Sequence, residues 1–181
     1  MINQTGLKVT TEVLWRAAVI FALMDTVFVI VMAKKIKPHI FRELKLSLVI
    51  SSGIYWAAVW MLMVSFFWAP VYKYVFPGWA RWLIPPVYGL FFAGISLLFW
   101  WMSIRLPGHP TVNFCILGGI WGMITHMWGI HRGLLEKPPM LQGVSPVAAS
   151  VMPIFEFIFY WCIILVLAST LRRSRHGQIA S

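Results

Sequence analysis

The chain has 181 residues, of which 60% are hydrophobic and only 11% are charged, and its formal net charge is +10. A soluble globular domain carries about 25% charged residues, so this composition excludes a protein whose whole surface faces water. The basic excess does not indicate nucleic-acid binding. Lys and Arg gather at the ends of long apolar stretches, where anionic lipid head groups attract them.

Five apolar stretches predict transmembrane helices, each of which needs about 20 mostly apolar residues. In chain order they cover residues 13–33, 46–68, 82–104, 112–130 and 147–171. Pro85 and Pro86 lie in the third stretch and suit the first turn of a helix. We therefore predict an all-α, polytopic membrane bundle of about five transmembrane helices, folded as one domain over residues 1–181.

The basic residues predict how the chain is oriented, because short cytoplasmic loops are enriched in Lys and Arg. Two regions are the richest: residues 34–45, after the first stretch, and residues 172–175, after the fifth. Five crossings put both regions on the same side of the membrane. We expect the N-terminus outside and the C-terminus in the cytoplasm, in a multi-pass protein of the bacterial inner membrane.

Three ionisable residues, Asp25, His126 and Glu156, lie within the apolar stretches. A charge at bilayer depth costs about 2.5–3.5 kcal/mol on insertion scales, so such residues usually face protein or water. We expect all three to face the interior of the bundle. Asp25 then needs a partner on another helix, or it carries a proton.

The fourth stretch is rich in glycine. Residues three and four apart share a face of a helix. One face is therefore lined by Gly119, Gly122, His126 and Gly129, and Gly118 and Gly122 have Gly-xxx-Gly spacing. Small residues let another helix approach closely, so we predict a helix–helix contact here. His126 is then either a neutral residue hydrogen-bonded to a neighbouring helix or a residue that binds a ligand or transfers a proton.

Glu156 lies three residues after Pro153 in the fifth stretch. Proline removes a backbone donor, which predicts a bend and a free carbonyl near the carboxylate. The fourth and fifth helices run antiparallel in the predicted topology, which brings His126 and Glu156 to a similar depth in the outer half of the membrane. The pair fits a structural hydrogen bond, a metal-ligand pair or a proton relay.

Arg16, His131 and Arg132 are further candidates for binding. Arg16 follows Glu12 by four residues, which predicts an ion pair at the outer interface. His131 and Arg132 come directly after the fourth stretch. They fit either a polar anchor for the loop or a contact with an anionic head group or substrate.

The sequence contains no HExxH, Walker loop, Rossmann glycine pattern or CxxC pair. Its two cysteines, Cys115 and Cys162, lie in apolar runs and are expected to be small buried side chains rather than a disulfide. No metal or cofactor is predicted by name.

Three functions from different classes fit these observations. The first is an accessory or structural subunit of a larger membrane complex, with other membrane proteins or further copies of the chain as partners. The second is a membrane-embedded enzyme or redox protein acting on a lipid or quinone, with Glu156 and His126 as catalytic residues. The third is a component of a proton-linked transporter that uses Asp25 and Glu156. We expect the first to fit best, because a small bundle has little interior of its own.

Overall fold

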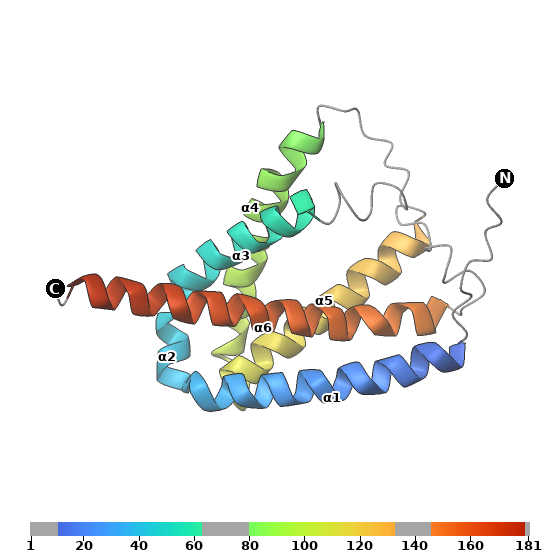
Figure 1. The fold of residues 1–181 in the computed structure, drawn as a ribbon, viewed down its shortest axis with the longest axis horizontal. Coiled ribbons are helices and arrows are strands. Elements are labelled where there is room, and N and C mark those ends of the chain that lie inside the picture. The colour runs from blue at the N-terminus through green and yellow to red at the C-terminus, as the bar shows by residue number, and fades with distance from the viewer. Residues whose placement is uncertain (1–10, 63–79, 133–145, 180–181) are drawn as a thin grey trace.

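The computed structural model describes residues 11–62, 80–132 and 146–179 (Figure 1). The helices in chain order are α1 (Thr11–Lys35), α2 (Pro38–Glu43), α3 (Lys45–Val59), α4 (Ala80–Ser103), α5 (Pro110–His131) and α6 (Pro146–Ile179). The described residues contain no strand. The predicted all-α fold is confirmed.

Within the described residues, four segments are long and apolar enough to cross a membrane: Glu12–Lys35, Lys45–Leu62, Leu83–Ser103 and Val151–Ser174. They correspond to the first, second, third and fifth predicted stretches, so the chain is a multi-pass membrane protein. Helix α5 corresponds to the fourth stretch. Its 22 residues rise about 33 Å at 1.5 Å per residue, but its glycines and polar side chains lower its hydropathy below that of the other four. A fifth crossing therefore stays a prediction.

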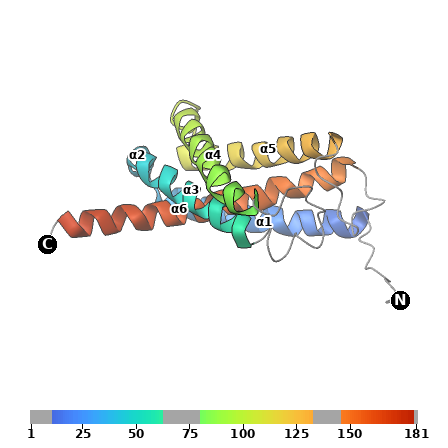
Figure 2. The same ribbon diagram turned by 90° about the horizontal axis from the view of Figure 1, so that it is seen from above.

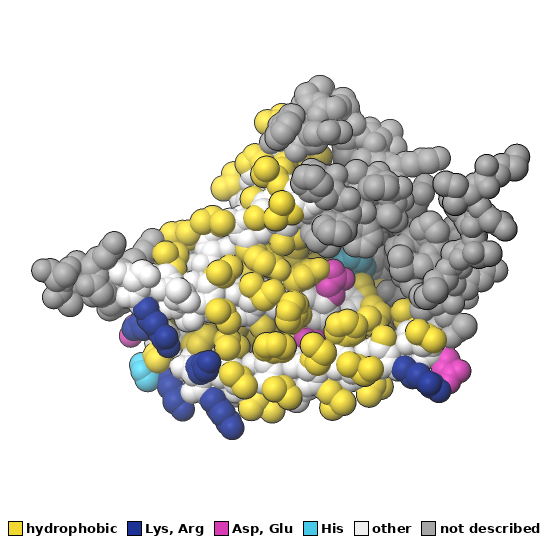
Figure 3. All heavy atoms as spheres, in the orientation of Figure 1, with side chains coloured by type: hydrophobic (Ala, Val, Ile, Leu, Met, Phe, Trp, Pro, Cys, Tyr) yellow, Lys and Arg dark blue, Asp and Glu magenta, His cyan; other side chains and the backbone are white. Residues whose placement is uncertain are grey.

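Helices α1 and α6 lie side by side and run in the same direction, and α5 packs antiparallel along α6 (Figures 1 and 2). Helices α3 and α4 form a second pair, which crosses α6 and diverges from it in Figure 1. The basic residues gather at the end of the bundle where α1 and α6 finish (Figure 3). The residues after α1 and those at the end of α6 meet there, because Arg172 forms an ion pair with Glu43. Which membrane face this end occupies stays a prediction.

Helix α2 connects α1 to α3 and was not predicted. It has only six residues, too few for a hydrophobic period to identify. Pro38 occupies its beginning, where a missing N–H does no harm. Its Phe41 is completely buried and meets Phe114 of α5 edge to face, with 5.7 Å between ring centroids. This short helix thus fixes the basic end of the bundle against α5.

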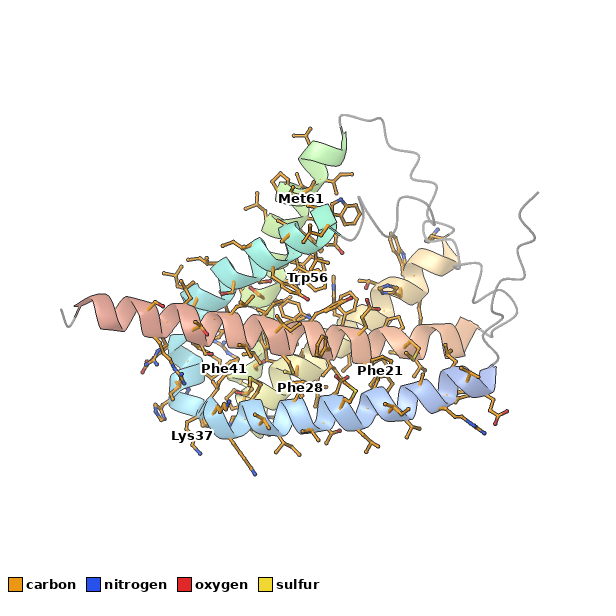
Figure 4. All side chains as sticks on the ribbon, in the orientation of Figure 1. Phe21, Phe28, Lys37, Phe41, Trp56 and Met61 are labelled. Atoms are coloured by element: carbon orange, nitrogen blue, oxygen red, sulfur yellow. The ribbon has the colours of Figure 1, made fainter. Side chains whose placement is uncertain are left out.

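Aromatic rings fill the centre of the bundle. Trp161 of α6 is completely buried, and its ring centroid lies 5.3 Å from that of Phe99 and 5.2 Å from that of Phe114. Trp56 of α3 stacks on Phe92 of α4 at 4.2 Å. Figure 4 shows Trp56 directed from α3 towards the middle of the bundle. These rings join α3, α4, α5 and α6 into one core.

Two details of the predicted helices need correction or lie beyond the described residues. Pro85 and Pro86 do not open a helix, because α4 begins at Ala80 and includes both of them. A proline pair within a helix leaves carbonyl groups of the preceding turn without their usual donors, and in α4 this preceding turn is the beginning of the helix. The end of the second predicted stretch, residues 63–68, lies outside the described residues.

The two cysteines provide a direct test of how α5 packs on α6. Cys115 and Cys162 are free and buried, with their sulfur atoms 3.6 Å apart. We expect a membrane-permeable oxidant such as diamide to join them in an intramolecular disulfide, because the two thiols already touch. Peptide mapping by mass spectrometry should find the linked peptides in oxidised membranes and not in chains unfolded in SDS before oxidation. Separately alkylated cysteines in oxidised membranes would contradict this packing.

Candidate functional site

The glycines of α5 lie where this helix contacts α6. A Cβ atom on Gly118 would overlap the ring of Trp161, and one on Gly122 would overlap the ring of Phe157. A Cβ on Gly119 would lie 2.7 Å from the Ile158 side chain. Bulky side chains of α6 therefore pack directly against the glycines of α5. Gly129 is in the last turn of α5, but its surroundings lie outside the described part of the structure.

His126 lies on the same side of α5, one turn beyond Gly122. Its Nδ1 atom is 2.9 Å from the Gly122 carbonyl oxygen. A carbonyl only accepts, so Nδ1 must carry the proton in this bond, and a neutral imidazole then keeps an acceptor at Nε2. The half-buried His126 ring meets Phe157 of α6 edge to face, with 5.5 Å between centroids. His126 is thus held by its own helix, with its second nitrogen left to interact with something else.

Glu156 is adjacent to Phe157 on α6, so it lies at the level of His126. The two residues are therefore at a similar level along the contact of α5 with α6, but no hydrogen bond joins them, and their depth in the membrane stays a prediction. The Glu156 side chain is exposed, which corrects the expectation that it faces the interior. Helix α6 contacts α1, α3 and α5, and Glu156 occupies a face that these helices leave open. The helix continues through Pro153, which is buried.

Two tyrosines accompany Glu156. The hydroxyl of Tyr160 donates a hydrogen bond to Glu156 Oε1 from the next turn of α6. Tyr55 of α3 lies beside Tyr160, with ring centroids 6.0 Å apart. Figure 3 shows an acidic side chain next to a histidine side chain on this otherwise hydrophobic face of the bundle. We call the group Glu156, Tyr160, Tyr55 and His126 the Glu156 cluster. The two tyrosines were not predicted from the sequence. Tyr160 could have been, because residues four apart, such as Glu156 and Tyr160, share a face of a helix.

Asp25 lies apart from this cluster, near the middle of the apolar segment of α1. It is only 4% exposed, on the same buried stripe of α1 as Leu14, Ala18 and Met32. Its Oδ2 atom has no hydrogen-bond partner. Asp25 therefore faces the interior as expected. Its Oδ2 atom, however, has no hydrogen bond to a partner on another helix.

The remaining candidates lie near the ends of helices. Arg16 forms the predicted ion pair with Glu12, with 2.5 Å between nitrogen and oxygen and more than two thirds of each side chain exposed. An exposed ion pair of this kind contributes about 0–1 kcal/mol to the stability of the folded protein. Arg132 is exposed directly after α5, and the side chain of His131 lies outside the described part of the structure. The structure does not bring Arg16 and Arg132 into the Glu156 cluster.

A metal site is not apparent among the described residues, which contain no group of three His, Cys, Asp or Glu side chains close enough to hold an ion. Searches of protein-family models, curated proteins and solved structures found nothing that matches this chain.

Proposed function

We propose that this protein is a subunit of a larger membrane complex and that it meets its partner at the Glu156 cluster. The exposure of Glu156 is the observation that carries the proposal. Glu156 is the sixth residue of the apolar segment Val151–Ser174, which puts it about 7.5 Å along the helix axis from the start of that segment. A carboxylate facing lipid at that depth is unfavourable by a few kcal/mol, and such groups usually face protein or water.

The surroundings of Glu156 support a protein partner. The neighbouring exposed side chains on α6 and α1 are apolar, and they include Phe159 and Phe28, whose rings touch at 5.6 Å. Tyr160 supplies one hydrogen bond to the carboxylate, but an ionised carboxylate accepts several. A cationic or amide side chain from a second membrane helix would donate the further hydrogen bonds to Glu156, and apolar side chains would pack around this contact.

A second candidate is a membrane-embedded enzyme or redox protein that acts on a lipid or quinone at the same cluster. The hydrogen bond from His126 Nδ1 to Gly122 favours it, because this bond leaves Nε2 of the half-buried ring as an acceptor for a ligand. A bound lipid or quinone whose retention requires both His126 and Glu156 would support this candidate. The proton-linked transporter stays a prediction without a specific observation in its favour.

The proposed interface is tested by photo-crosslinking in native membranes. A photoreactive phenylalanine analogue in place of Phe159 is expected to link the chain to a second membrane protein or to another copy of itself. Glu156→Gln in the same chain should lower the crosslinked fraction about tenfold or more, because losing one member of a desolvated charge pair costs about 2–5 kcal/mol.

The matched control carries the same analogue at Leu98, an exposed residue of α4. Its crosslinks should not respond to Glu156→Gln. The proposal fails if the Phe159 position links only to lipid, or if its protein crosslinks are equally strong with glutamine at position 156. Differently tagged copies expressed together distinguish self-association from a second protein.

A further inference from the structure

A small cavity of about 70 Å³ lies between α1, α2 and α6, far from the Glu156 cluster. It is lined by the polar side chains of Lys35, Arg172, Arg173 and Ser169 and by the apolar side chains of Met32, Ile36 and Ile40. At about 30 Å³ per water molecule, the volume has room for roughly two waters, so it suits a small group such as a single phosphate. The lining therefore combines side chains that suit an anion with side chains that suit a hydrocarbon.

The cavity lies at the boundary between membrane and water. Lys35 is the last residue of the apolar segment that begins at Glu12, and Arg173 is the second-last residue of the segment Val151–Ser174. A cavity at the ends of two membrane-spanning helices is at the level of the lipid head groups. The phosphates of the adjacent leaflet are thus at the depth of these basic side chains.

The charge around the cavity is strongly positive. The described basic residues at this end are Lys34, Lys35, Lys37, Arg42, Lys45, Arg105, Arg172 and Arg173. Glu43 is the acidic residue among them, and it is engaged in an ion pair with Arg172. This ion pair holds Arg172 in place at the wall of the cavity, while Lys35 and Arg173 are exposed beside it.

We propose that this cavity binds the phosphate group of an anionic phospholipid. A guanidinium group presents paired N–H donors that match two phosphate oxygens, and an ammonium group adds a compact positive charge. Arg173 and Lys35 bind the phosphate, and Met32, Ile36 and Ile40 contact the glycerol and the start of the acyl chains. The apolar residues of the lining favour a lipid over free phosphate, because free phosphate has no apolar part to place against them.

The test measures binding of three probes to the full chain in a non-ionic detergent: short-chain phosphatidylglycerol, short-chain phosphatidylcholine and inorganic phosphate. Phosphatidylglycerol should bind the most tightly. The double substitution Lys35→Gln and Arg173→Gln should raise its Kd about 30-fold, as expected for the loss of two basic residues close to the lipid. Both side chains are exposed, so the double variant is expected to fold, and Arg173→Gln alone provides a milder version.

The matched control is Lys34→Gln with Arg42→Gln, which removes the same charge from exposed residues at the same end but outside the cavity lining. Its Kd should change only slightly. Equal weakening by both double variants would overturn the cavity as the site and leave a general attraction to the basic end. Equal affinity for inorganic phosphate and phosphatidylglycerol would overturn the lipid as the ligand.

Discussion

Gly118→Ala is expected to lower the free energy of unfolding by about 3 kcal/mol, near the upper end of what overpacked cores usually show. The added Cβ would overlap the ring of Trp161, which is completely buried. The ring cannot move aside, because it is already in contact with Phe99 and Phe114. Helices α5 and α6 would therefore have to separate. Denaturant unfolding of the purified chain in mild detergent measures the loss.

The matched control is Gly94→Ala, because a Cβ at Gly94 of α4 would meet nothing within 4 Å. Glycine in a helix is about 0.8–1.0 kcal/mol less favourable than alanine, so this control should unfold at the same or a slightly higher denaturant concentration. Equal behaviour of the two variants would show that α5 does not pack on α6 through Gly118.

Asp25→Leu is expected to raise the free energy of unfolding by about 1–3 kcal/mol, the usual cost of a buried polar group without a partner. Asp25 is buried and its Oδ2 has no hydrogen-bond partner. Unfolding in denaturant returns the carboxyl group of Asp25 to water, which favours the unfolded state. A leucine at this position favours the folded state instead, because its side chain is more stable in the apolar core than in water. The same denaturant titration measures the gain.

Asp25→Asn is the shape-matched comparison, since asparagine keeps the size and remains polar. It should change the stability less than leucine does. A large loss of stability with either substitution would contradict the view of Asp25 as an unsatisfied group and would indicate a bound proton or ion that secures α1 against α5.

The membrane helices could be predicted from the sequence because hydropathy and length alone identify most of them. The described residues contain four distinct apolar helices, and each of them overlaps a predicted stretch. Helix α2 was missed because it is short and interfacial. The unexpected start of α4 before Pro85 shows that a proline marks a helix start only by preference.

The faces of the helices were harder to predict than their positions. Helix α6 is apolar on nearly all sides, so its sequence has no stripe that identifies a buried face. Glu156 was therefore assigned to the interior, although it is exposed. In α1 the buried positions follow a regular spacing from Leu14 through Ala18 to Asp25, and the interior position of Asp25 was predicted correctly.

The glycines predicted a close helix contact but not what fills it. In α5 the space over Gly118 and Gly122 is taken by aromatic rings of α6. A close backbone approach occurs between α3 and α4, where a Cβ on Gly89 would be 2.5 Å from the carbonyl oxygen of Gly53. Those two glycines are far apart in the sequence, so only the three-dimensional structure pairs them.

The central claim, that this chain is a subunit of a membrane complex, is tested most directly by the intact mass of the untagged protein. The native assembly would be extracted in a gentle detergent and measured by native mass spectrometry, with metal and absorbance analysis of the same fraction. We expect the chain to be found with other membrane chains in a fixed ratio. A single chain carrying a bound metal, pigment, quinone or substrate lipid would contradict the claim and favour an enzyme.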